Sequence, residues 1–323
     1  MAIGLSRVFS KTPESVTVPV IDPKSVPIGF AREAFLRYLY PKDTSQVLTV
    51  PQKLVLNVTT HSMQKKESRQ KSVPRLPYVI PKLLKSLRDP NSSAKHYVQI
   101  IDKDPAMAAA VLKLANSVYF NPIGKRIDEI ETAVVKLGID GIRSVLSAAV
   151  LQPIIQRNSA YFSNSGQKIW QHSLYCAVAC ELIAEHRKVE KFKVYVMGLM
   201  HDIGTITLFS ELCKQFKLNH EDVAPGYNAF VPPIKAISIP LSYLIVKDWE
   251  LPQDICKALA EQNNISPDKE VSIFGQILYQ ANMVCETYDC IYPKNPKKAI
   301  ALLEELELPL TLYDSLEQLD KEL

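Results

Sequence analysis

The interpretation of this sequence depends most on residues 198–204, which read Gly198-Leu199-Met200-His201-Asp202-Ile203-Gly204. They lie within an apolar segment, 191–213, whose spacing predicts one continuous helix. Adjacent residues of a helix point about 100° apart, so His201 and Asp202 would flank an ion held between this helix and a neighbour. Imidazole and carboxylate groups are ligands of Fe, Mn and Zn. The motif therefore indicates a candidate metal site.

A metal site needs further ligands, and the preceding segment supplies a candidate in His172. This histidine lies in segment 167–186, which is also predicted to be helical. A bound ion would polarise a phosphoryl oxygen and lower the pKa of a bound water. The alternative is a structural role, because His172 shares an apolar face with Cys176 and both histidines would then be buried. Asp202 would orient one of them, and the trio would hold helices together.

The rest of the sequence from residue 73 onward predicts an all-α body. Apolar residues recur three and four apart, and Pro or Gly separates the segments. Strands do not alternate with helices, which excludes a doubly wound α/β sheet, and the small number of glycines, 10, disfavours a Gly-rich phosphate loop. The predicted helices are 77–87, 94–101, 105–118, 127–137, 140–157, 167–186, 191–213, 237–248, 252–263, 271–287, 296–307 and 313–323.

The N-terminal part differs from this body. Residues 1–27 lack a helical period and are predicted to be irregular, whereas 29–40 have the spacing of one short helix ended by Pro41. Residues 41–73 combine a β-prone piece at 54–59 with a polar stretch, which suggests a tether that docks on the body. We therefore expect residues 1–73 to be a mostly irregular extension, or adaptor, with one short helix.

The C-terminal part is acidic after Leu303, and its leucines keep a narrow apolar stripe at Leu312, Leu316 and Leu319. Such a stripe is typical of a helix docked on its own chain, and the alternative is a helix that binds a partner. We divide the rest of the chain into a helical domain, 74–288, and a C-terminal helical tail, 289–323.

Charge and composition narrow the function classes. The chain of 323 residues is 47% apolar and 22% charged, as in globular proteins, and no apolar run approaches the ~18–20 residues of a membrane span, so we expect a cytoplasmic protein. None of the six cysteines forms a CxxC pair, which favours buried thiols.

Positive charge gathers in the extension, where residues 1–73 contain 11 Lys and Arg against 5 Asp and Glu. An arm of this kind can contact phosphate groups. Glu67 interrupts the densest cluster and no aromatic residues alternate with it, so a solvated linker is favoured and nucleic acid is the lesser alternative. The candidate phosphate contacts are Lys65, Lys66, Arg69 and Lys71.

Short motifs follow a fixed order between residues 74 and 285. They are Leu76-Pro77 with Pro81, Asp104-Pro105-Ala106, Leu114-Ala115-Asn116-Ser117, the stretch from Ala133 to Gly138, Trp170 with His172-Ser173, residues 198–204, and Trp249-Glu250-Leu251-Pro252. In this ordered set the sequence resembles the HDOD domain, the HD-related output domain of bacterial signalling proteins. The resemblance implies a multi-helix HD-like bundle, signal transduction, and other signalling proteins as partners.

The parent HD superfamily comprises metal-dependent phosphohydrolases, and the resemblance assigns His172, His201 and Asp202 to three of its metal-ligand positions. The fourth position, an Asp in the family, aligns with Asn282. A neutral amide there leaves Asp202 as the only charged ligand, so affinity for a dication should fall steeply. We expect a vestigial site without a cofactor, or with weakly held Fe or Mn. Further family histidines align with Ser238, Gln262 and Asn263.

The leading hypothesis is therefore a non-catalytic HDOD-type regulatory protein that acts through protein contacts and carries no catalytic residue. The first alternative is a metal-dependent phosphohydrolase acting on a nucleotide or cyclic dinucleotide. Relatives that hydrolyse cyclic dinucleotides have Lys directly after the HDIG sequence, whereas Thr205 stands here. The second alternative is a nucleic-acid-binding regulator that uses the basic arm.

Overall fold

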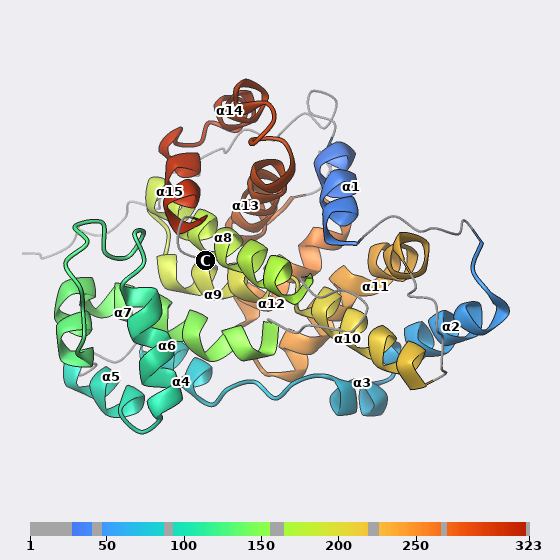
Figure 1. Ribbon diagram of the computed structural model, residues 1–323, viewed down its shortest axis with the longest axis horizontal. Helices are drawn as coiled ribbons and strands as arrows, with labels where there is room; N and C mark the ends of the chain where they lie inside the picture. The colour runs from blue at the N-terminus through green and yellow to red at the C-terminus, as the bar shows by residue number, and fades with distance from the viewer. Residues whose placement is uncertain are drawn as a thin grey trace, which may run out of the picture.

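The computed structural model describes residues 28–40, 47–86, 93–155, 165–218, 226–265 and 270–320. All regular elements in these ranges are helices and none is a strand, which confirms the predicted all-α class (Figure 1). The predicted irregular segment, 1–27, lies outside the described residues.

The centre of the fold is α8, Ser165–His186 (Figure 1). It packs against α9, Lys191–Met200, and against α13, Ile273–Cys290. Side chains around most of its circumference are buried, including Trp170, which is 2% exposed. A helix that is apolar on all sides is stable only when neighbours surround it, so the surrounding helices pack on α8.

Helices α4 to α7 form one end of the body (Figure 1). Asp104 caps α6, because its Oδ1 accepts the amide hydrogens of Ala106 and Met107 and Pro105 occupies the first turn. The two helices predicted at 127–137 and 140–157 correspond to the two halves of α7, which meet at a non-helical kink at Gly138, where φ is +67°. The bounds are Val79–Ser86 for α4, Ala94–Ile101 for α5, Pro105–Ala115 for α6 and Ile130–Ile155 for α7.

The single helix predicted over 191–213 is wrong, because the structure divides it at the His-Asp pair. Helix α9 ends at Met200, and α10, Ile203–Leu218, begins two residues after His201. A Cβ on Gly204 would lie 2.5 Å from the amide nitrogen of Ser242, so only glycine allows this close approach of α10 to α11, Tyr227–Asp248. The Ser242 hydroxyl accepts from the Gly204 amide at 2.9 Å and donates to the His201 carbonyl at 2.7 Å. The two helices thus fix the turn that carries the motif.

Helix α11, Tyr227–Asp248, begins ten residues before its predicted start, with three prolines inside it. Among the described helices it alone is long and apolar enough to cross a membrane, but 56% of its apolar window is buried. It packs against α10, against α2, Val50–Gln64, and against α12, Gln253–Glu261. A 3-10 turn, Gln262–Asn264, follows α12. The burial of α11 is that of a core helix.

The N-terminal extension is more regular than predicted. Helix α1, Ile28–Leu39, matches the predicted short helix, but the β-prone piece at 54–59 is wrong, since it lies in α2, Val50–Gln64. Thr49 and Gln52 form a capping box at the start of α2. Four buried side chains then recur at helical spacing on the face that packs against α10 and α11: Val55, Leu56, Thr59 and Met63. Burial and capping outweigh the β propensity of Val and Thr.

A buried ion pair ties the extension to the body at α3, Lys66–Ser72. Arg69 is 4% exposed, and its Nε and Nη2 donate to Asp248 Oδ2 at 2.9 and 2.8 Å. Its guanidinium is therefore already used at the end of α11, which disfavours the predicted phosphate contact. The other candidates, Lys65, Lys66 and Lys71, are exposed.

The C-terminal tail forms α14, Pro296–Glu305, and α15, Thr311–Asp320. The predicted apolar stripe of α15 is buried, and the helix packs against α8, where Tyr175 donates to Asp320. This arrangement confirms the docked helix rather than the partner-binding one.

We predict that Arg69→Met lowers the free energy of unfolding by about 2–4 kcal/mol in urea denaturation, because it leaves Asp248 without its counter-charge at a helix junction. Lys66→Met, on the exposed side of the same helix, is the matched control and should change it by less than about 0.5 kcal/mol. Equal effects of the two substitutions would contradict the structural role of the Arg69–Asp248 ion pair.

Candidate functional site

The structure brings the predicted ligand residues together at one junction of three elements. His172 lies on α8, His201 and Asp202 form the α9–α10 turn, and Asn282 lies on α13. The imidazole centroids are 5.4 Å apart, and Asp202 Oδ2 is 3.4 Å from His201 Nε2. His172 Nε2 lies 3.1 Å from Asn282 Oδ1. Asn282 thus faces the histidines at the position where the resemblance implies a carboxylate.

Both imidazoles are held by their second nitrogen. His172 Nδ1 donates to Asp289 Oδ2 at 3.0 Å, and His201 Nδ1 donates to the Gly198 carbonyl at 2.8 Å. These bonds fix the two rings so that each Nε2 points toward the centre of the cluster. His172 is 1% exposed.

The charges in the cluster stabilise one another. Burial favours the neutral form of Asp202, but His201, Arg32 and His172 outweigh it and hold the pKa of this carboxyl well below its usual range. Burial likewise opposes protonation of His201, yet the Asp202 carboxylate raises the pKa of this imidazole to about 10. For His172, burial is outweighed by the Cys176 sulfur and the Asp289 carboxylate, and its pKa is also raised. At neutral pH the cluster therefore consists of compensating ions.

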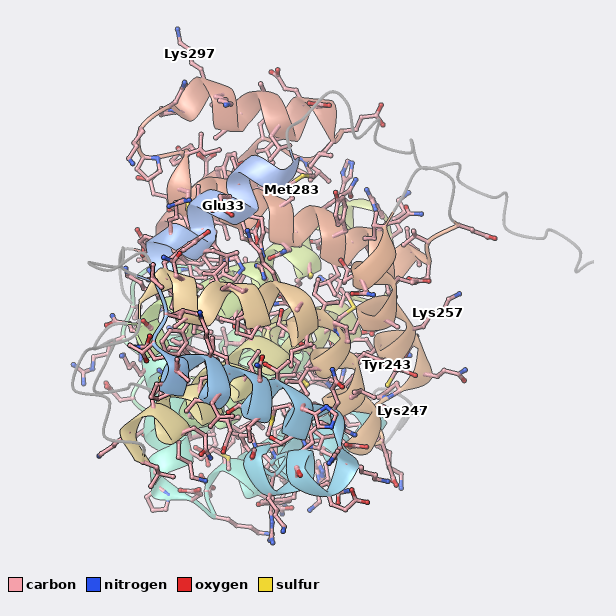
Figure 2. All side chains as sticks on the ribbon, turned by 90° about the vertical axis from the view of Figure 1, so that its right-hand side faces the viewer. Glu33, Tyr243, Lys247, Lys257, Met283 and Lys297 are labelled. Carbon is pink, nitrogen blue, oxygen red and sulfur yellow. The ribbon has the colours of Figure 1, made fainter. Side chains whose placement is uncertain are left out.

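Arg32 on α1 supplies a further positive charge to this cluster. Its Nη1 lies 2.7 Å from Glu286 Oε1, and the Glu286 side chain is only 4% exposed. The same Glu286 oxygen accepts from Asn282 Nδ2 at 3.3 Å. On the next turn of α1, the Phe35 ring packs on His172 with centroids 4.1 Å apart. Helix α1 thus packs against α13 (Figure 2), and its Phe35 contacts the cluster.

Several of these residues were not identified from the sequence as parts of the site. Cys176 stands four residues after His172, and Glu286 and Asp289 follow Asn282 by four and seven residues, so helical spacing is the signal that could have placed each of them on the same face as the predicted ligand. No comparable signal identified Arg32 and Phe35, because their helix is separated from the site by more than 130 residues of chain.

The three other positions that align with family histidines contribute less to the site. A cavity of about 160 Å³ opens beside His201 and Asp202, and Gln262 is the aligned residue that lines it. Its Nε2 donates to the carbonyls of Ala258 and Gly275, which occupies the amide structurally. Ser238 is buried under Gly204, and Asn263 is exposed.

The donors do not fit a hydrolytic Fe or Mn centre of the kind that the resemblance implies. Asn282 offers a neutral oxygen that already accepts from His172, and the Arg32 guanidinium adds positive charge beside the carboxylates. The Cys176 sulfur lies with both imidazole nitrogens in a group spanning no more than 4.8 Å. A thiol is a soft ligand, whereas Mn favours carboxylate, carbonyl and water oxygens.

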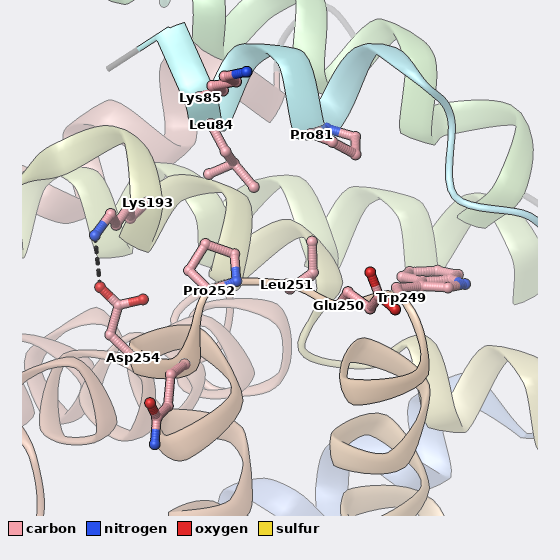
Figure 3. A pocket seen from close by; sticks show the side chains of 10 residues that line it. Pro81, Leu84, Lys85, Lys193, Trp249, Glu250, Leu251, Pro252 and Asp254 are labelled. Carbon is pink, nitrogen blue, oxygen red and sulfur yellow. Dashed lines mark hydrogen bonds and ion pairs between the residues drawn. The ribbon is translucent and has the colours of Figure 1, made fainter. Parts of the chain in front are cut away.

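The Trp249-Glu250-Leu251-Pro252 motif forms a separate groove of about 660 Å³ between α4, α9 and the start of α12 (Figure 3). Glu250 has a φ of +55° where α11 ends. Lys193 and Asp254 form an ion pair at 2.6 Å on one wall (Figure 3). The groove contains none of the ligand candidates, so this motif serves the chain reversal between α11 and α12.

We predict that Arg32→Met lowers the free energy of unfolding at pH 7 by about 2–3 kcal/mol, because buried Glu286 loses its guanidinium partner. The matched control is Arg37→Met on the same helix, whose half-exposed side chain pairs with Glu33. Its effect should stay below about 1 kcal/mol. Chemical denaturation of both variants checks this, and a larger loss for Arg37→Met would refute the role given to Arg32.

Known proteins share the fold of this chain. The HDOD domain model matches residues 73–265, and no curated protein matches. An HDOD domain protein of unknown function from Geobacter sulfurreducens is 19% identical, with a TM-score of 0.55 over 83% of this chain and 94% of that one. A candidate metal-dependent phosphohydrolase from Shewanella amazonensis SB2B is 17% identical, with a TM-score of 0.58 over 85% and 99%.

A candidate signal transduction protein from Marinobacter aquaeolei VT8 is 17% identical, with a TM-score of 0.50 over 84% of this chain and 62% of that one. Identities at this level show a shared fold and leave the chemistry of the site open. The family match covers more than half of the chain and includes the helices that carry His172, His201 and Asp202. The protein therefore belongs to the HDOD family.

Proposed function

We propose that this protein is a non-catalytic HDOD regulator that works in signal transduction through contacts with other proteins. The observation that carries the proposal is the seating of α1 on the degenerate site, with Arg32 paired to Glu286 and Phe35 packed on His172. The description of the Marinobacter relative as a candidate signal transduction protein is in keeping with it.

Charge balance supports the absence of hydrolysis. Three carboxylates, those of Asp202, Glu286 and Asp289, meet at the site and pair with Arg32 and the two imidazoles. A hydrolytic metal would have to enter a cluster that is already neutralised and would face the Arg32 guanidinium. It would also need an open position for the attacking water.

The size of the cavity beside the site is a second, independent argument against hydrolysis. The cavity beside His201 measures about 160 Å³, whereas small-molecule sites usually measure about 300–1,000 Å³. Phe35 covers the other side of His172. A cyclic dinucleotide would not fit beside the His-Asp pair unless α1 moved away.

Contacts with other proteins are supported by the outer face of α2. Val50, Leu54 and Val58 stand on successive turns and are 79%, 63% and 59% exposed, while the opposite face packs on the body. Exposed apolar rows of this kind mark interaction surfaces, and an amphipathic helix of a partner would fit one. The extension would then join the site, through α1, to a partner, through α2.

The first test measures hydrolysis by the full chain with Mn²⁺, using bis(p-nitrophenyl) phosphate and cyclic dinucleotides as substrates. We expect rates equal to those of His201→Ala, because the site holds no hydrolytic metal. Turnover that requires Mn²⁺ and disappears in His201→Ala would establish the phosphohydrolase instead.

A second test addresses the partner surface. We expect the full chain, used as bait, to retain a defined signalling protein from an extract of the source cells. Leu54→Glu should abolish this retention, because a charge on the apolar row opposes docking. Lys53→Glu introduces the same side chain at an adjacent exposed position and should retain the partner. Loss in both variants, or in neither, would contradict the assignment of this face.

A further inference from the structure

The outer side of α2 has an apolar part and a charged part that follow one another along the helix. The apolar row consists of Val50, Leu54 and Val58, which are 79%, 63% and 59% exposed. The buried residues of α2 lie on the opposite side, where the helix packs against α10 and α11. This packing holds the row outward, at one end of the molecule (Figure 1).

Positive charge begins where the apolar row ends. At about 100° per residue, Lys65 at the end of α2 falls on the same side of the helix as the row. Lys66 and Lys71 follow on α3, and all three lysines are exposed. We call these three lysines the basic patch. Among residues 47–72 the only carboxylate is that of Glu67, so the patch keeps a net positive charge.

This pattern distinguishes between the classes of partner that bind basic surfaces. Residues 47–72 contain no Phe, Tyr or Trp on which the bases of a nucleic acid could stack. The row is one side chain wide and is bordered by exposed Lys53 and Asn57, whereas a helix that lies in a membrane surface has a broad apolar face with Trp, Phe or Leu. An amphipathic helix has a narrow apolar stripe that fits such a row, and its carboxylates would complement the patch.

We infer that α2 and the start of α3 form the docking site for an acidic amphipathic helix of a partner protein. The apolar stripe of that helix covers Val50, Leu54 and Val58, and carboxylates on its following turns pair with Lys65 and Lys66. Exposed charge pairs contribute to specificity and association rate more than to affinity, so the row holds the partner and the basic patch selects an acidic one. The inference rests on the proposed function and adds the chemistry of the partner to it.

Two synthetic peptides test this inference with the full chain. Both are Ala-based helices of about 18 residues with leucines spaced four residues apart. The Glu peptide carries glutamates on the following turns, and the Lys peptide carries lysines at the same positions. We expect fluorescence anisotropy to show that the Glu peptide binds at least about tenfold more tightly at low salt, and that added salt reduces the difference.

Substitutions on the protein assign the binding to this surface. The double variant Lys65→Glu/Lys66→Glu should bind the Glu peptide about tenfold more weakly. Lys95→Glu/Lys103→Glu is the matched control, because it changes the net charge equally at two exposed positions near α5, at the other end of the body (Figure 1). It should bind the Glu peptide as the wild type does. Leu54→Glu should bind neither peptide, and circular dichroism checks that each variant is folded.

Equal affinities for the two peptides, equal losses in the two double variants, or no binding of the Glu peptide would overturn the inference. Binding to phosphatidylserine-containing vesicles that Leu54→Glu abolishes would overturn it too, because the surface would then serve a membrane. A protein retained from the cell extract through Leu54, but equally well by Lys65→Glu/Lys66→Glu, overturns the acidic partner and leaves the proposed function intact. Mn²⁺-dependent hydrolysis refutes the proposed function whichever peptide binds.

Discussion

The buried carboxylates at the junction of α8, α13 and the α9–α10 turn require positive charge close by, and the rest of the site depends on how the chain provides it. Asp202 pairs with His201, Asp289 with His172, and Glu286 with Arg32. Burying an unpaired carboxylate costs several kcal/mol, so each partner is needed to keep the helices together. In a metal-dependent relative a dication would supply part of this charge. Here the side chains supply it themselves.

This constraint makes the N-terminal extension part of the site. Arg32 reaches Glu286 only because α1 lies along α13, and the same placement brings Phe35 onto His172. The extension is held to the body a second time where Arg69 pairs with Asp248. A signal that moved α1 would expose the histidines and unbalance the charges together. The position of the extension and the charge balance of the site therefore depend on the same contacts.

The sequence was sufficient to predict the helical body and the proximity of His172, His201 and Asp202, because both follow from helical periodicity and short motifs. It did not predict the break at His201, which depends on the contact of Gly204 with α11, or the helix at Val50–Gln64, where burial outweighs β propensity. Arg32 could not be assigned, because its contact with Glu286 spans 254 residues and no local pattern encodes such a pairing. Helical spacing placed Cys176 beside His172, but only the structure shows its sulfur between the imidazoles.

We propose that the side chains of this site supply its positive charge and that the site does not hold a hard dication. Electron paramagnetic resonance of Mn²⁺ tests it most directly, because the six-line signal of the free ion diminishes when the ion binds. We predict that titrating the full chain leaves the free Mn²⁺ signal unchanged at micromolar concentrations. Loss of one equivalent of that signal in the wild type, restored in Asp202→Asn, would contradict it.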